Sequence, residues 1–76
     1  MKVLPAKWSK QLASLDETGM GYQVIAVTLA DGRKIEDIAI VDSHVIAEVR
    51  GYDDIPFDPA EIVAFELTHT RWKFRR

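Results

Sequence analysis

Large apolar residues near the amino end follow the spacing of a helix. They recur at intervals of four, four and three positions, which places them on one side of a helix: Leu4, Trp8, Leu12 and Leu15. Pro5 suits a first helical turn, where no backbone N–H is needed, and Gly19 can end the segment. The pattern predicts a short amino-terminal helix over residues 5–16.

Residues 22–30 follow the alternation of a strand and are rich in β-branched side chains. Ile25, Val27 and Leu29 share one face of this strand. The other face is also fairly apolar and holds Tyr22, Val24, Ala26 and Thr28. A strand that is apolar on both faces is covered on both sides. We therefore expect a barrel interior on one side and a helix or a second subunit on the other.

A hairpin is predicted next. Asp31-Gly32 supplies the positive φ angles of a tight turn, and residues 33–41 form the return strand. In a regular strand, Ile38 and Ile40 would lie on the face opposite Ile35. A β-bulge near residues 36–37 would bring all three to one face and would bend the strand sharply.

Two more strands follow a turn at Asp42-Ser43. In the third strand, over residues 45–50, Val45, Ala47 and Val49 share a face, and Gly51 ends it. Residues 54–57 are predicted to form a short fourth strand, which Pro56 confines to an edge or an end.

The last predicted elements are one helical turn and a closing strand. Asp58-Pro59-Ala60-Glu61 is typical of a helix start, with an Asp cap, Pro at the first position and Glu at the third. The β-branched residues that follow favour a fifth strand over residues 62–69, with Val63, Phe65 and Leu67 on one face.

These elements predict a mainly β fold: a small, five-stranded, strongly bent barrel with an amino-terminal helix. We expect one domain over residues 1–76, in which the barrel spans residues 22–69 and a basic and aromatic tail spans residues 70–76.

The predicted order resembles the Sm-like fold within the SH3-like small barrels. The stretch VTLADGRKI is similar to the first motif of that family, and Val41-Asp42 lies where the motif has an apolar residue and an Asp. The resemblance implies rings in which the fourth strand of one subunit pairs with the fifth strand of the next, here residues 54–57 and 62–69. The implied edge residues are Ile55, Phe57, Ile62, Ala64 and Glu66, and RNA binding is implied as well.

Length, composition and charge add to this picture. The chain has 76 residues and no cysteine, so a small core without disulfides must stabilise it. Small proteins of this kind often gain stability by self-association.

The charges are unevenly distributed along the chain. The first ten residues carry three lysines and no acid, and the last six carry four basic residues and no acid. The middle holds all twelve acids. The basic ends either lie against the acidic body or form an arm for nucleic acid.

The tail has two interpretations. Basic residues alternate with Trp72 and Phe74, so the aromatic rings could stack bases while the cations meet phosphates. Alternatively, the two rings extend the last strand and pack in the core near Trp8. The candidates for nucleic-acid contact are Arg71, Trp72, Lys73, Phe74, Arg75 and Arg76, together with Asp42 and His44.

No motif points to catalysis. Asp42-Ser43-His44 cannot form a triad on an extended chain, because Ser43 points away from the other two side chains. His44 and His69 lie on different predicted strands, and the acids at residues 53–58 lack the pattern of a calcium loop. We expect no enzyme activity, metal, cofactor or small-molecule substrate.

The sequence also bears on location and role. It has neither an apolar run long enough to span a membrane nor a signal peptide, so we expect a cytoplasmic protein. The predicted function is a non-enzymatic binding or self-assembly module that forms a homo-oligomer. The alternative is an Sm-like protein that binds single-stranded RNA.

Overall fold

The computed structural model describes residues 2–72 and 74. Its elements are β1 (Lys2–Val3), α1 (Ala6–Ala13), β2 (Tyr22–Leu29), β3 (Lys34–Val41), β4 (Val45–Val49), the 3-10 turn η1 (Pro59–Glu61) and β5 (Ile62–Leu67). Within these residues the protein is mainly β with a short amino-terminal helix, so the predicted fold class is confirmed.

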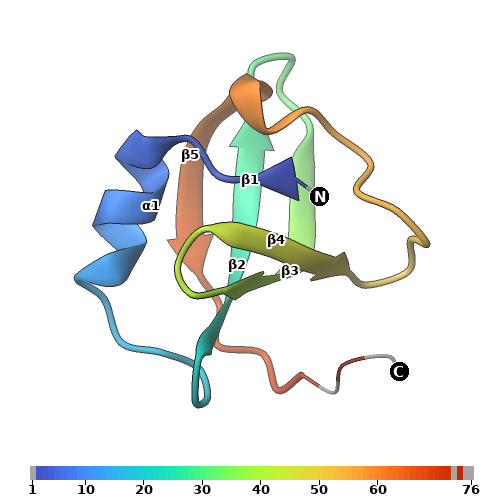
Figure 1. Cartoon of the computed structure of the whole chain (residues 1–76). Helices are drawn as coiled ribbons and strands as arrows, with labels where there is room; N and C mark the ends of the chain where they lie inside the picture. Colours follow the sequence, from blue (N-terminus) through green and yellow to red (C-terminus); the bar gives the residue numbers. More distant parts are fainter. Residues whose placement is uncertain (1, 73, 75–76) are drawn as a thin grey trace.

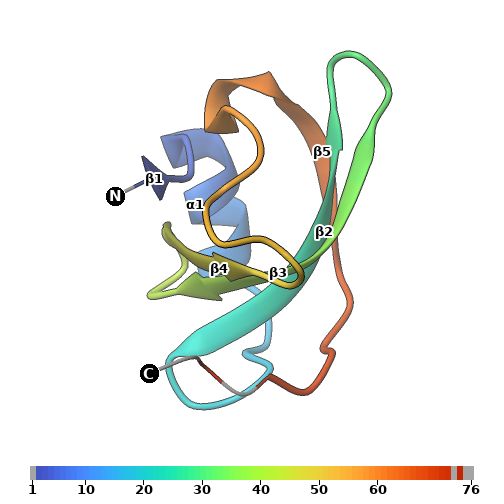
Figure 2. The ribbon, with the colours of Figure 1, turned by 90° about the vertical axis from the view of Figure 1, so that its right-hand side faces the viewer.

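The five strands form one antiparallel sheet in the order β1-β4-β3-β2-β5. The sheet curls into a half-barrel, and α1 lies on its concave side (Figures 1 and 2). The strands β2, β3 and β4 follow one another as a meander, while β1 and β5 lie at the two edges. The curl gives the sheet an inner face, which holds the core, and an outer face.

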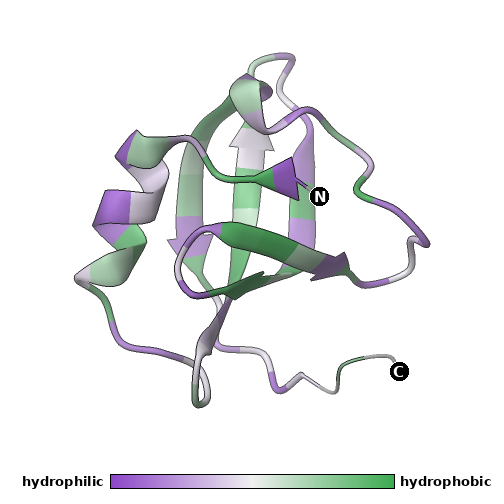
Figure 3. Ribbon diagram, viewed as in Figure 1, coloured by the Kyte–Doolittle hydropathy of each residue, from purple (hydrophilic) through white to green (hydrophobic). Residues whose placement is uncertain are grey.

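The core fills the space between the helix and the inner face. Ile25, Val27 and Leu29 of β2 share this face, as their spacing predicted, and each is about 1% exposed. Trp8 of α1 meets the ring of Phe65 edge-on, with the ring centroids 5.7 Å apart. In Figure 3 much of β2 and β4 carries the apolar colour. Other members of the core cluster are Leu4, Leu12, Ile38, Ile40, Ile46, Val49, Phe57 and Ile62.

The bulge predicted in the second strand of the hairpin is present. The register of β2 against β3 shifts between Ile25 and Val27, so that Glu36 and Asp37 together oppose one residue of β2. Asp37 adopts a left-handed backbone with φ of 55°, and its carbonyl accepts the Arg50 N–H at 3.0 Å. This bulge increases the bend of β3.

Two further bulges overturn predicted faces. In β4 the register shift leaves Ala47 as the extra residue, so Ile46 and Val49 point inward together. In β5 the extra residue is Val63, which is 53% exposed instead of sharing a face with Phe65 and Leu67. The prediction of regular alternation in these two strands is therefore wrong.

The predicted fourth strand is also wrong. Residues 54–57 form an irregular segment, and Lys2–Val3 takes the place beside β4 instead. The Lys2 ammonium donates to the carbonyl oxygens of Phe57 at 3.0 Å and Ile55 at 3.5 Å. The segment is thus held by its backbone carbonyls and by burial of Phe57 rather than by a sheet ladder.

The helix is shorter than the predicted range of 5–16, and the Gln23 side chain bonds to carbonyls at and just beyond its end. The Gln23 side chain, 1% exposed, donates to the carbonyl oxygens of Leu12, Leu15 and Asp16. Carbonyls at a helix end lack partners within the helix, and here an amide from β2 supplies a donor. The end of α1 is therefore tied to the centre of the sheet.

The hairpin turn at Asp31-Gly32 holds three residues in its loop. Leu29 donates to the Arg33 carbonyl and accepts the Gly32 N–H, and Gly32 has a φ of 93°. The Asp31 carboxylate accepts the Arg33 backbone N–H and the Arg33 guanidinium. These bonds lower the pKa of Asp31 below its ordinary value of 3.8. The hairpin is as predicted, but its tight turn requires a positive φ at Gly32 and not at Asp31.

Candidate functional site

The carboxyl end of the chain returns beneath the sheet. Residues 68–72 and 74, which we call the C-terminal strap, leave β5 and run below the bent part of β2, β3 and β4 on the side opposite α1 (Figures 1 and 2). Paired residues of neighbouring strands share a face, so the register places Val24, Ala39 and Glu48 in one row on this outer face. Val24 and Ala39 are fully buried.

Thr18 and His69 fix the start of the C-terminal strap. Thr68 donates its backbone N–H to the Val24 carbonyl at 3.0 Å. The Thr18 hydroxyl accepts the Val24 N–H and lies 2.9 Å from Nδ1 of His69. His69 has a φ of 53°, and this left-handed residue follows closely after the end of β5. The chain therefore leaves the sheet edge and turns toward the outer face.

Five residues then meet on the outer face, Arg71 through its backbone carbonyl, and we call them the aromatic–basic cluster: Tyr22, Arg50, Arg71, Trp72 and Phe74. The Arg50 guanidinium lies over the Trp72 ring, 4.7 Å from its centroid. The ring centroids of Trp72 and Phe74 are 6.4 Å apart, and Phe74 meets Tyr22 edge-on at 5.3 Å.

Hydrogen bonds set the position of Trp72 and of the backbone beside it. The indole N–H donates to the Glu48 carboxylate at 3.0 Å, and Arg50 donates to the Arg71 carbonyl at 3.2 Å. The three aromatic rings are half-buried, while Arg50 and Arg71 are exposed. The cluster therefore presents aromatic surface and two cations together to solvent.

This arrangement corrects one interpretation of the tail. Trp72 and Phe74 neither extend β5, which ends at Leu67, nor join the core near Trp8. They pack on the opposite face of the sheet. Arg71 lies in the same cluster, whereas Lys73, Arg75 and Arg76 fall outside the described residues. Sequence reasoning missed Tyr22 and Arg50, because no local signal links them to residues some 20 to 50 positions away.

Asp42 and His44 lie at the turn between β3 and β4. Asp42 and Ser43 both adopt left-handed backbone, with φ of 54° and 62°, and His44 donates its N–H to the Val41 carbonyl. The His44 carbonyl accepts the Leu4 N–H at 2.7 Å, next to β1. Asp42 and His44 are therefore both part of the turn that joins β3 to β4.

The predicted oligomer-edge residues differ in burial. Phe57 and Ile62 are buried in the core, and Ile55 packs against it. Ala64 and Glu66 are exposed on β5. Glu66 forms an ion pair with Lys34 of β3, 2.6 Å long, which raises the pKa of Lys34 above its ordinary value of 10.5.

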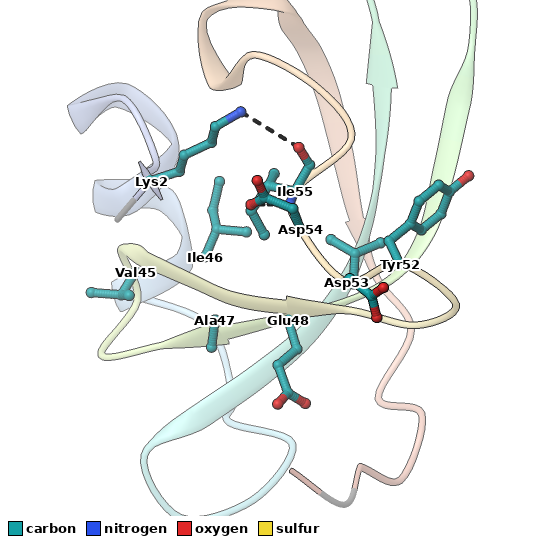
Figure 4. Close-up of a pocket in the computed structure, with 10 residues that line it drawn as sticks. Lys2, Val45, Ile46, Ala47, Glu48, Tyr52, Asp53, Asp54 and Ile55 are labelled. Carbon is teal, nitrogen blue, oxygen red and sulfur yellow. Dashed lines mark hydrogen bonds between the residues drawn. The ribbon is translucent and has the colours of Figure 1, made fainter. Parts of the chain in front are cut away.

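A groove of about 520 Å³ lies between β4 and residues 52–55 (Figure 4). Lys2 reaches into it and bonds to the Ile55 carbonyl, while the Asp54 carboxylate accepts the backbone N–H of Ile55. Ala47 and Glu48 of its lining point to the other side of β4. Among the described residues, no three His, Asp or Glu side chains converge as a metal site would require.

The helical segments of the described chain are too short to cross a membrane. No protein-family model, no curated protein and no solved structure matches the sequence or the fold of this chain.

Proposed function

We propose that this chain is a non-enzymatic self-assembly module, built on a small barrel of the Sm-like and SH3-like type, which binds a second copy of itself through β5. The observation that carries the proposal is the position of β5 at the end of the sheet. It pairs with β2 on one side, and within the described residues no strand pairs with its other side.

The open side of β5 is suited to pairing with another chain. An edge strand presents backbone N–H and C=O groups that can add a further strand. β5 has six residues, which include the exposed Val63 and Ala64. Ala64 is small and therefore gives little steric hindrance to an approaching strand. Phe65 and Leu67 are only partly buried and would lose further exposure in such a pair.

A second β5 is the partner with the best match in length. The opposite edge of the sheet is β1, which has only two residues. A head-to-tail contact between β5 and the next copy's β1 would therefore form few ladder bonds. Two β5 strands related by a two-fold axis can pair over residues 64–67, beyond the bulge at Val63, and antiparallel pairing satisfies this symmetry. A dimer is expected rather than the ring implied by the resemblance.

Sedimentation equilibrium of the chain and of two variants tests the proposal. Val63→Lys places a charge on the edge of β5, a device that blocks strand addition. Met20→Lys is the matched control, since Met20 is 98% exposed and lies outside the sheet. We expect the wild type and Met20→Lys to exceed the chain mass of 8.6 kDa at micromolar concentration. Val63→Lys should sediment as a single chain with an unchanged far-ultraviolet spectrum.

Two outcomes would contradict the proposal. The first is a wild type that remains a single stable chain at millimolar concentration. The second is a Val63→Lys variant that associates as strongly as Met20→Lys, because assembly would then use another surface.

A further inference from the structure

The structure points to a second binding surface: we propose that the aromatic–basic cluster binds single-stranded nucleic acid. This inference does not depend on self-assembly through β5, since every residue of the cluster comes from one copy of the chain. It rests on the contacts among Tyr22, Arg50 and the C-terminal strap.

The aromatic part of the cluster is already ordered in the unbound chain. Trp72 is held by its bond to Glu48 and by the guanidinium over its ring, and Phe74 is held against Tyr22. All three residues remain partly exposed. Bases of a single strand stack on partly exposed aromatic rings, and stacking accepts any base because every base has a flat face. Little side-chain entropy is lost when the rings are fixed beforehand.

Cations accompany the aromatic rings. Arg50 lies over the Trp72 ring, and Arg50 and Arg71 are both exposed. Residues 11–70 hold all twelve Asp and Glu residues, so this middle part of the chain is acidic overall. Phosphates would therefore be repelled by most of the barrel and attracted to the exposed arginine side chains at the cluster.

Glu48 is an acidic residue beside the cluster. A substitution can remove its negative charge and still keep the hydrogen bond that positions Trp72. Glu48 accepts the indole N–H of Trp72. Glu48→Gln keeps an acceptor oxygen at this place but removes the negative charge. The nucleic-acid proposal therefore expects tighter binding in this variant. A cluster that recognises a basic partner would instead lose affinity.

The two tryptophans allow contact to be observed directly. Trp8 is 8% exposed in the core, whereas Trp72 lies in the cluster. In Trp8→Phe the emission reports on Trp72 alone, and in the matched control Trp72→Phe it reports on Trp8 alone. We expect oligouridine or oligothymidine of about ten nucleotides to quench the emission of Trp8→Phe and to leave that of Trp72→Phe unchanged.

The salt dependence of binding tests the cations. Each phosphate contact to a single strand contributes about −0.7 to the log–log slope. The double variant Arg50→Gln/Arg71→Gln should therefore make the slope less negative by about 1.4, from two lost contacts. The control Lys7→Gln/Lys10→Gln removes two cations from α1, on the other side of the sheet, and should leave the slope unchanged. Thermal melts of all variants report whether each still folds.

The proposal is overturned if neither oligonucleotide quenches Trp72 at low salt. It is also overturned if the α1 control and the Arg50/Arg71 variant change the slope equally, or if Glu48→Gln weakens binding. Equal quenching by oligouridine and oligothymidine identifies a general single-strand surface, and stronger quenching by oligouridine identifies an RNA surface. Both of these results support the proposal.

Discussion

Gln23 shows how one side chain can connect a helix to a sheet. It lies on the β2 face that is otherwise apolar, yet its amide nitrogen meets three carbonyls at the end of α1. Its amide oxygen accepts the Ser43 hydroxyl at 3.4 Å. A buried polar group stabilises a fold only when its hydrogen bonds are made. Here they also tie the end of α1 to β2.

Gln23→Leu should destabilise the fold by about 2 kcal/mol, because it keeps the approximate volume but removes the donor for carbonyls near the helix end. Urea unfolding measures the change. Gln23→Glu is a useful comparison, since it adds a buried carboxylate that faces carbonyl oxygens. It should cost more than Gln23→Leu at neutral pH. A Gln23→Leu variant as stable as the wild type would mean that water replaces the amide.

At the scale of elements, only one of the three bulges could be predicted from the sequence. The bulge in β3 interrupts the apolar alternation, whereas those in β4 and β5 leave it unbroken. Ile35 and Ile38 lie on opposite faces of a regular strand, so a bulge between them could be predicted. In residues 45–49 an uninterrupted alternation of Val45, Ala47 and Val49 gave no sign that Ala47 is the extra residue. The two-residue strand β1 is too short to leave any pattern.

The same limit applies to the candidate site. Alternation of basic and aromatic residues identified Trp72 and Phe74 within a few positions of one another. Their partners Tyr22 and Arg50 are brought in by the register of β2 and by the path of the C-terminal strap. Such long-range contacts are products of the tertiary fold. The pattern of seven residues could not specify them.

The hairpin between β2 and β3 offers a test of a single element. Gly32 has a φ of 93° and open space around its Cα, so only backbone strain opposes a side chain there. Gly32→Val should destabilise the fold by more than about 1 kcal/mol. Gly32→Asn should cost less, because Asn tolerates left-handed backbone better than a β-branched residue. Superimposable thermal melts of wild type and Gly32→Val would contradict the assigned turn.

For the whole molecule, the fold separates the two surfaces for which binding is proposed. The open side of β5 lies at one edge of the sheet, and the aromatic–basic cluster lies on the outer face below β2 and β4. The cluster faces away from the core beneath α1, and the open side of β5 lies at the edge of the sheet that covers this core. Because their residues do not overlap, Val63→Lys should leave the cluster intact, and variants of Arg50 or Arg71 should leave the edge of β5 intact.

The strand order has a consequence for the order in which the chain folds. β2, β3 and β4 are neighbours both in sequence and in the sheet, so closing their loops costs little entropy. β1 and the C-terminal strap must be brought to the sheet from more than forty residues away, as the pairs Lys2–Ile46 and Thr68–Val24 show. Local contacts tend to form first. The meander should therefore act as one cooperative unit, on which both ends of the chain dock later.

Native-state hydrogen exchange would reveal this hierarchy. The amides of Ile25 and Ile40, inside the meander, should exchange only through global unfolding, while those of Leu4 and Thr68 should exchange through smaller openings that leave the meander intact. Equal protection at all four amides would instead show a single cooperative unit. On the expected hierarchy, the C-terminal strap opens and closes while the barrel stays folded. A ligand that binds the closed aromatic–basic cluster would therefore slow hydrogen exchange at the Thr68 amide.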